Sequence, residues 1–444
     1  MLGQYRGIHL TCILSKTIER MIAQPLVPFL EATAFGRSQW AFRKKSSARD
    51  LIVLCTARWV MHICRGDKIG VYLSDISGAF DKVSRILLLG KLSQIGLPDS
   101  FLDFLNSWLL PRQGYVAVEN AMSDVMLLCN MVFQGTVLGP PLWNAFFADV
   151  VPSTAEGQQV VNLFADDLTA EHHAPVRVTA ETVMQGLRGL QQRTHKWGVR
   201  NQVSFDASKE HLKIIHPRAA LGEDFKMLGT LFDCKLSMQP CIEDMLAKAR
   251  PKVRALIRIK HLFSVASLVN QYKTHVWGFS EYSNGAIILA SPFQLKRIDR
   301  MQRWFLKEIG ITDTEAFLVH NFAPPSLRRT IGILGLLHKR VLCLCHPGLI
   351  QALPFSQENR LIYHNKTLHT FLGDVRVNHK LYFKSLYGYT HMYNRLTQTL
   401  VDLPSVCSFQ AKLTHLVKTR AEIGDAAWRQ SLDDSGKILQ LCHA

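Results

Sequence analysis

The chain has 444 residues, of which 48% are hydrophobic and 20% are charged, and this composition excludes an intrinsically disordered protein. A single hydrophobic core stops growing near about 250–300 residues, so the length predicts several subdomains. With 52 Lys and Arg against 35 Asp and Glu, the formal net charge is +17, which favours a polyanion such as nucleic acid as a partner but equally serves solubility.

The first two predicted elements are helices. Residues 13–30 show the apolar spacing of a helix, and Pro25 and Pro28 predict that this helix gives way to a turn. Residues 47–65 repeat the helical spacing. We therefore expect a helical N-terminal region of about 66 residues.

A strand and several shorter elements follow. Residues 68–75 alternate with period two, which predicts a strand whose last residue is Asp75. Residues 80–95 and 98–110 show helical spacing and are bounded by Gly or Pro, and residues 115–133 contain two short apolar runs typical of a hairpin.

A Gly-rich loop then opens a helix. The loop contains Gln134 and Gly135, and the helix is expected over residues 142–150. In residues 159–170, two apolar runs flank Ala165-Asp166-Asp167, which predicts a hairpin with adjacent acids at its tip.

The remainder of the chain is mostly helical in its pattern. A helix over about residues 179–197 precedes two strand regions at 211–216 and 225–232. Residues 241–324 are helical and basic, and residues 325–444 are helical in composition without any further motif.

The acids at the strand end and the hairpin tip suit a metal site. Asp75, Asp166 and Asp167 lie on separate elements, as is needed to hold two divalent cations about 3.5–4 Å apart for phosphoryl transfer. Hard cations prefer oxygen ligands, so we expect two Mg²⁺ ions, with Mn²⁺ as the alternative. Taken alone, an Asp-Asp pair is more often an ordinary surface turn.

Three segments occur in an order that changes this assessment. Asp75-Ile-Ser-Gly-Ala-Phe80-Asp81, Gln134-Gly135-Thr-Val-Leu-Gly-Pro and Phe164-Ala-Asp166-Asp167 resemble the A, B and C motifs of the reverse-transcriptase palm. The residues in these three motifs are typical of the branch that contains non-LTR (LINE-type) retrotransposons and group II introns. Further blocks favour the non-LTR elements, and an intron maturase is the alternative within the branch.

Weaker blocks extend the resemblance to about residues 4–240. Tyr5-Arg6-Gly7 and Gln39-Trp-Ala41-Phe-Arg43 resemble the two fingers blocks, although the family usually has Pro in place of Gly7 and Gly in place of Ala41. Asn201 to Lys209 is similar to the fourth block, and Phe225 to Gly229 to the fifth. Because the chain starts inside the first block, we expect a reverse-transcriptase domain fragment of a longer reading frame.

The resemblance implies an α+β right-hand polymerase fold with fingers, a palm built on an antiparallel sheet, and a helical thumb. We assign residues 1–66 to N-terminally incomplete fingers and residues 67–240 to the palm with inserted fingers elements. Residues 241–324 would be the thumb, and residues 325–444 a C-terminal helical region of unknown role.

The resemblance also implies roles for individual residues. Asp75, Asp166 and Asp167 would be the catalytic metal ligands, and Lys209 would protonate the departing pyrophosphate. Phe80 would pack under the incoming sugar and exclude a 2′-hydroxyl, so deoxynucleotides are expected; a core aromatic residue is the alternative for Phe80.

Further residues would bind the substrates. Gln134 and Gly135 would line the approach of nucleotide and template, and Arg43 and Lys44 would contact the triphosphate. A solvated charge run is the alternative for Arg43 and Lys44, and a surface lysine is the alternative for Lys209. The partners implied are an RNA template, a DNA primer, their RNA–DNA hybrid and dNTPs.

Two other functional classes remain open at this point. One is a catalytically degenerate, reverse-transcriptase-like or maturase-like protein that only binds nucleic acid, and the other is a two-metal nuclease. No stretch of about 18 uninterrupted apolar residues and no signal-peptide layout occurs. We therefore expect an intracellular protein of the nucleus and cytoplasm that is neither secreted nor associated with a membrane.

Overall fold

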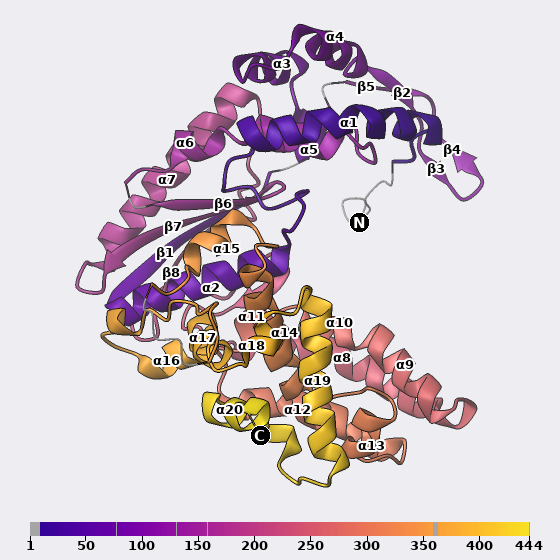
Figure 1. Cartoon of the computed structure of the whole chain (residues 1–444). Coiled ribbons are helices and arrows are strands. Elements are labelled where there is room, and N and C mark those ends of the chain that lie inside the picture. Colours follow the sequence, from indigo (N-terminus) through magenta and orange to yellow (C-terminus); the bar gives the residue numbers. More distant parts are fainter. Residues whose placement is uncertain (1–8, 77, 130, 158, 358–362, 444) are drawn as a thin grey trace. The chain divides into compact units, whose positions relative to one another are not determined.

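The structure, a computed structural model, describes residues 9–443 except 77, 130, 158 and 358–362. It forms two compact units (Figure 1). The first unit comprises Met1–Lys44, Gly70–His173 and Thr179–Leu212, and the second comprises Lys45–Ile69, Ala174–Val178 and Lys213–Ala444. Mixed helices and antiparallel strands confirm the predicted α+β class.

The first unit surrounds most of the main sheet with helices. Its elements are α1 (Ile13–Thr33), η2 (Ala79–Lys82), α3 (Arg85–Gln94), α4 (Asp99–Trp108), β2 (Arg112–Gly114), β3 (Ala117–Val118), β4 (Ala121–Met122), β5 (Met126–Leu128), α5 (Gly139–Phe147), α6 (Val150–Thr154), β6 (Val160–Phe164), α7 (Ala180–Asn201) and most of β1 (Asp67–Ser74) and β7 (Asp167–Pro175).

The main sheet has the strand order β6-β7-β1-β8, where β8 spans His211–Ile215. Strands β6 and β7 are antiparallel, with Phe164 opposite Asp167 at the turn. Helix α7 packs closely on β1, because a Cβ at Gly70 would lie 2.8 Å from Val183 of that helix. Every residue of β1 after its first is buried, so this strand forms part of the core.

Helix α1 differs from its prediction. Pro25 and Pro28 both lie inside the helix, which continues to Thr33 instead of turning. Both prolines are solvent-exposed, whereas Leu26 and Leu30 are buried in the core. Packing of this apolar face therefore outweighs the loss of two backbone N–H donors.

Other elements agree with their predictions apart from their bounds. The helix expected over 80–95 is divided into η2 and α3, because Val83 and Ser84 are not helical. The hairpin expected over 115–133 is formed by two short pairs, β2 with β5 and β3 with β4. The acid-tipped hairpin is present as β6 and β7.

The second unit is predominantly helical, which confirms the helical composition expected for residues 241–444. Its bounds are α2 (Ala48–Arg65), β9 (Phe225–Met227), β10 (Thr230–Phe232), α8 (Gln239–Arg258), η3 (Lys260–Leu262), α9 (Val265–His275), α10 (Trp277–Glu281), α11 (Asn284–Ile287), α12 (Pro292–Glu308), α13 (Asp313–Leu318), α14 (Pro325–Val341), α15 (Pro347–Ala352), η4 (Leu372–Asp374), α16 (His379–Lys384), α17 (Leu386–Tyr393), α18 (Gln398–Val401), α19 (Val406–Glu422), η5 (Trp428–Gln430) and α20 (Ser435–His443). None of the described helices combines the length and the apolar character that a bilayer-spanning helix needs.

Candidate active site

The three predicted acids converge at one end of the sheet, within the first unit. Asp75 directly follows β1, and Asp167 begins β7. Asp166 lies in the turn before β7, and the preceding Ala165 has a φ of 56°, in the left-handed region. The carboxyl groups of Asp75 and Asp166 lie within hydrogen-bonding reach of each other. The sequence therefore located a genuine cluster of carboxylates.

Burial and mutual repulsion make this cluster costly to ionise. Burial, and then the charge of Asp75, raises the pKa of Asp166 to about 6. Burial, and then the charges of Asp166 and Asp75, raises the pKa of Asp167 to about 7. Near neutral pH the site concentrates negative charge, which a cation would stabilise.

Lys209 supplies positive charge to this cluster. Its ammonium group contacts the Asp75 carboxylate and lies 3.8 Å from Asp206. The loop that contains Lys209 is fixed to the strand end, since the Asp206 N–H donates to the Asp75 carbonyl at 3.0 Å. The predicted catalytic lysine thus lies beside the predicted metal ligands.

A network around Glu210 holds the other side of that loop. The largely buried Glu210 carboxylate accepts hydrogen bonds from the Tyr72 hydroxyl at 2.5 Å and the Gln191 amide at 2.8 Å. It also contacts His195 Nε2 at 2.7 Å. These bonds connect the residue next to Lys209 with β1 and with α7.

Gln39 is a residue of the site that sequence reasoning did not identify. Its side chain is fully buried, and Oε1 accepts from the backbone N–H groups of Trp40, Ala41 and Ala165 at 3.0, 3.0 and 3.2 Å. The neighbouring backbone pairs with β6, since Leu163 donates to Ser38 and accepts from Trp40. Gln39 therefore holds the left-handed turn that presents Asp166. No local pattern in the sequence marks this role, because the partner Ala165 lies 126 residues away.

Glu19 plays a comparable part in the Gly-rich loop. It is 2% exposed, and its carboxylate accepts from the backbone N–H groups of Val137 at 2.6 Å and Leu138 at 3.3 Å. The Trp108 indole N–H donates to the other oxygen at 3.3 Å. Glu19 thus satisfies N–H groups that precede α5, where a negative charge is also favourable.

The loop residues Gln134 and Gly135 lie four to five residues before the start of α5 at Gly139. Gly135 has a φ of +75°, and a Cβ there would lie 2.5 Å from the carbonyl oxygen of His9. Thr11 also donates to the Gly135 carbonyl at 3.2 Å. Contact with the chain's own N-terminal segment is therefore sufficient to require glycine at this position, and Gln134 beside it is partly exposed.

Phe80 belongs to an aromatic group beside the acids. Its ring stacks on Trp143 with centroids 5.8 Å apart and meets Phe42 edge-on at 6.4 Å. The Trp143 indole N–H donates to the Ala165 carbonyl at 3.0 Å. Phe80 is thus packed against the same residue that anchors the acid turn, and it remains partly exposed.

Arg43 and Lys44 differ in their exposure to solvent, because Arg43 is partly buried and Lys44 is exposed. Arg43 donates to the carbonyls of Gly36 at 2.6 Å and Gln39 at 3.2 Å, and burial lowers its pKa. A triphosphate contact by Arg43 would require its guanidinium to leave these carbonyls.

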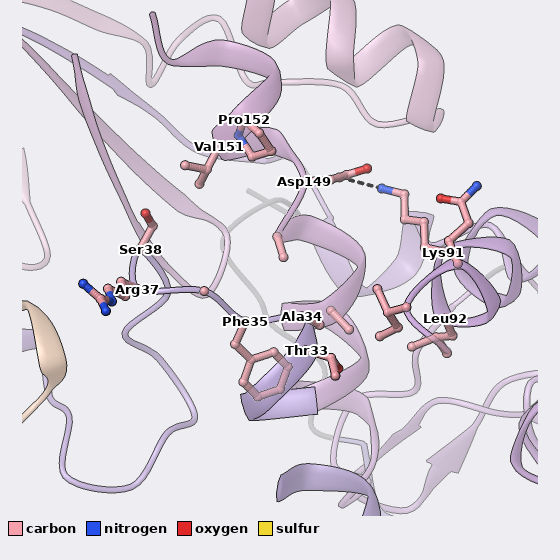
Figure 2. A pocket seen from close by; sticks show the side chains of 15 residues that line it. Thr33, Ala34, Phe35, Arg37, Ser38, Lys91, Leu92, Asp149, Val151 and Pro152 are labelled. Carbon is pink, nitrogen blue, oxygen red and sulfur yellow. Dashed lines mark hydrogen bonds and ion pairs between the residues drawn. The ribbon is translucent and has the colours of Figure 1, made fainter. Parts of the chain in front are cut away.

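A separate cavity of about 370 Å³ lies between the end of α1 and helices α3, α5 and α6 (Figure 2). Phe35 and Leu92 contribute to its wall, and the ion pair of Lys91 with Asp149, at 2.8 Å, closes one side. None of the predicted catalytic or substrate-binding residues lines it.

The donor set at the acids fits magnesium. Within the described part of the chain, no three or more Asp, Glu, His or Cys side chains form a ready-made metal cage. Mg²⁺, however, usually takes one or two protein carboxylates and completes its shell with water and substrate phosphates. The closely spaced carboxyls of Asp75 and Asp166 match that requirement.

The sequence that forms this site matches a known protein family. The family profile of reverse transcriptase (RNA-dependent DNA polymerase) matches residues 2–212, which include all the acids and Lys209. Residues 2–212 are a reverse transcriptase domain. The predicted α+β polymerase fold agrees with this membership.

Relatives of this reverse transcriptase domain come from mobile elements. The chain is 24% identical over 339 residues to a probable RNA-directed DNA polymerase from transposon X-element of Drosophila melanogaster, covering 69% of this chain and 36% of the relative. It is 25% identical over 325 residues to the RNA-directed DNA polymerase from mobile element jockey of Drosophila funebris, covering 69% and 35%. These relatives confirm the predicted kinship with non-LTR retrotransposons, and the chain spans about a third of their length.

Solved structures resemble the chain more distantly. Apo telomerase from Candida tropicalis is 10% identical with a TM-score of 0.42, covering 71% of this chain and 55% of that chain. Telomerase from Candida albicans in complex with a telomeric RNA fragment is 10% identical with a TM-score of 0.39, covering 70% and 57%.

Proposed function

We propose that the chain is an RNA-directed DNA polymerase of a retrotransposon, which transfers a nucleotide from a dNTP to a primer 3′-hydroxyl. The convergence of Asp75, Asp166 and Asp167 beside Lys209 is the observation that carries this proposal. An RNA template, a DNA primer and their hybrid are the corresponding partners.

Asp75 and Asp166 would together hold two Mg²⁺ ions, or Mn²⁺, with Asp167 as a further ligand or neighbouring charge. When bound, the cations supply activation of the primer hydroxyl and neutralise charge on the triphosphate. The fold supports these roles, because a strand end positions Asp75 and a hairpin tip positions Asp166. Gln39 in turn fixes the turn between β6 and β7.

Lys209 would act on the leaving group. Its ammonium lies at the acid cluster, where it can donate a proton to a pyrophosphate oxygen as the bond to the α-phosphate breaks. Glu210 and its partners would keep the loop in register with β1 during that transfer.

Phe80 would select deoxynucleotides. Stacking on Trp143 leaves the ring little freedom to move aside, so a ribonucleotide 2′-hydroxyl would meet a fixed obstacle. Gln134, Gly135 and Lys44 would complete the nucleotide and template approach, with Arg43 joining them only after leaving its carbonyls.

A catalytically degenerate, maturase-like binding protein is the second candidate. The engagement of Arg43 with its own loop favours it, as do Gly7 and Ala41 where the family usually has Pro and Gly. That protein would keep the fold and the net positive charge, and would bind template without synthesis.

Primer extension on an RNA template with Mg²⁺ and dNTPs separates the two candidates. The unmodified protein is compared with Asp166→Asn, and with Asp103→Asn as a control that removes an exposed acid from α4. Extension by the unmodified and control proteins only would support the polymerase. Tight template binding by all three without any extension would favour the degenerate candidate.

A further inference from the structure

Helix α16 and the segment before it carry exposed basic side chains together with an exposed aromatic ring. Phe383 is 52% exposed, Arg376, His379 and Lys380 are also exposed, and Lys384 is partly exposed. Lys380 and Lys384 are one helical turn apart and therefore share a face. We name these five residues the α16 surface.

The α16 surface is rigidly mounted within the second unit. The backbone N–H groups of Arg376 and Val377 both donate to the Cys64 carbonyl of α2, at 2.8 and 3.0 Å. Tyr382 is fully buried and donates to the Thr370 carbonyl at 2.5 Å. Because the neighbouring backbone is already fixed, ligand binding would have to order only the exposed side chains.

The positive charges on this surface are not neutralised locally. Among the described residues, none of the Arg376, Lys380 and Lys384 side chains has a carboxylate within 4.0 Å. Asp374, the nearest acid along the chain, is paired with Arg65. Burial, and then the charge of Lys380, lowers the pKa of Lys384, so the lysines repel each other as long as no anion is bound.

Phe383 gives this surface a feature that a general anion site does not need. One edge of its ring packs on Tyr382, with centroids 5.1 Å apart, and on His391 at 5.7 Å, while about half of the side chain faces solvent. Phe383 is adjacent to Lys384 and three residues after Lys380 on the same helix. An aromatic ring supported in this way beside cationic side chains suits an unpaired base and its phosphates, since the bases of a duplex are stacked inside it and cannot reach the ring.

We propose that the α16 surface is a binding site for single-stranded RNA, with a base stacked on Phe383 and phosphates on Arg376, Lys380 and Lys384. The site would retain RNA that is not paired with the primer, independently of the acid cluster. The choice of RNA over single-stranded DNA rests on the proposed polymerase function. The stacking and phosphate contacts are independent of that function.

The test measures RNA binding while the catalytic site is occupied. The full chain is saturated with an unlabelled RNA–DNA hybrid, and the affinity for a fluorescent single-stranded RNA is measured by anisotropy over a salt series. The variants are Lys380→Gln with Lys384→Gln, and Phe383→Ala. The control, Lys196→Gln with Lys412→Gln, also removes two charges, from exposed lysines on α7 and α19.

We expect the double lysine variant to lower the slope of log affinity against log salt by about 1.4, since each contact to a single strand contributes about 0.7. Phe383→Ala should weaken RNA binding by about 5- to 150-fold, the range for loss of one stacked base. The control should bind like the unmodified protein. Equal binding by the lysine variant and the control, or no RNA binding by the hybrid-saturated protein, would overturn the proposal.

Two further measurements separate the possible failures. Primer extension on a short hybrid reports the polymerase function alone and should be unchanged in all these variants. Absent extension with lysine-dependent RNA binding would leave the α16 surface standing and remove only the polymerase. Lysine-dependent binding to phosphatidylserine vesicles, together with no effect of the variants on RNA, would identify a membrane site and overturn the RNA proposal.

Discussion

Asp166→Asn should stabilise the metal-free protein while it abolishes polymerisation. A rise in the pKa of Asp166 from 3.8 to about 6 means that its ionised form costs the fold about 3 kcal/mol relative to its protonated form. Asparagine carries no charge and can donate to the neighbouring Asp75 carboxylate. At pH 8, with chelator present, we therefore expect a gain of about 3 kcal/mol in the free energy of unfolding of the first unit.

The pH dependence of this gain follows from the direction of the shift. Because the folded-state pKa of Asp166 is raised, the folded protein binds more protons than the unfolded protein between about pH 4 and 6. Stability of the unmodified protein should fall as pH rises through this window. Below pH 3.8 the carboxyl is protonated in both states, so the gain from Asn should vanish there.

Urea unfolding followed by tryptophan fluorescence measures the effect, since Trp143 and Trp197 lie in the core of the first unit. Asp103→Asn serves as the control without a buried charge. Adding Mg²⁺ at about 100 times its dissociation constant should raise the stability of the unmodified protein by about 2.7 kcal/mol and that of Asp166→Asn by much less. A gain that is absent at pH 8, or equally large at pH 4, would refute the reasoning.

Three other substitutions have expected outcomes. Phe80→Ala should raise the kcat/KM for ribonucleotides relative to deoxynucleotides, and an unchanged ratio would contradict the sugar-selecting role. Gln39→Leu should lower the free energy of unfolding by about 3 kcal/mol, because it leaves backbone groups at the acid turn unpaired. It should also weaken Mn²⁺ binding, which calorimetry measures. A loss of stability with unchanged Mn²⁺ affinity would argue against a positioning role for Gln39. Glu19→Ala should cost about 3 kcal/mol by orphaning the N–H groups of Val137 and Leu138, and urea unfolding that matches the unmodified protein would exclude this.

The elements that carry the three acids were predictable because their signals are local. Asp75 at the end of an alternating strand and Asp166-Asp167 at a hairpin tip follow from period-two patterning and turn chemistry within a few residues. Their order along the chain then identified the family without any distance information.

The supporting residues were not predictable because their roles depend on partners far along the chain. Gln39 bonds to Ala165, which is 126 residues away, and Glu19 bonds to Val137, which is 118 residues away. No local pattern records such pairings. The same limit explains α1, where burial of Leu26 and Leu30 against the core outweighs the helix-breaking tendency of Pro25.

The pairing of residues 38–40 with β6 limits how this domain can be recombined. The bridge between Gln39 and Leu163 is parallel, and the Gln39 amide completes the acid turn from a segment that precedes β1 in the chain. An exchange of the first 66 residues between related proteins would therefore replace Gln39 and its neighbours but leave the original β6–β7 hairpin in place. Chimeras should retain function only when residues 38–41 and the β6–β7 hairpin come from the same parent.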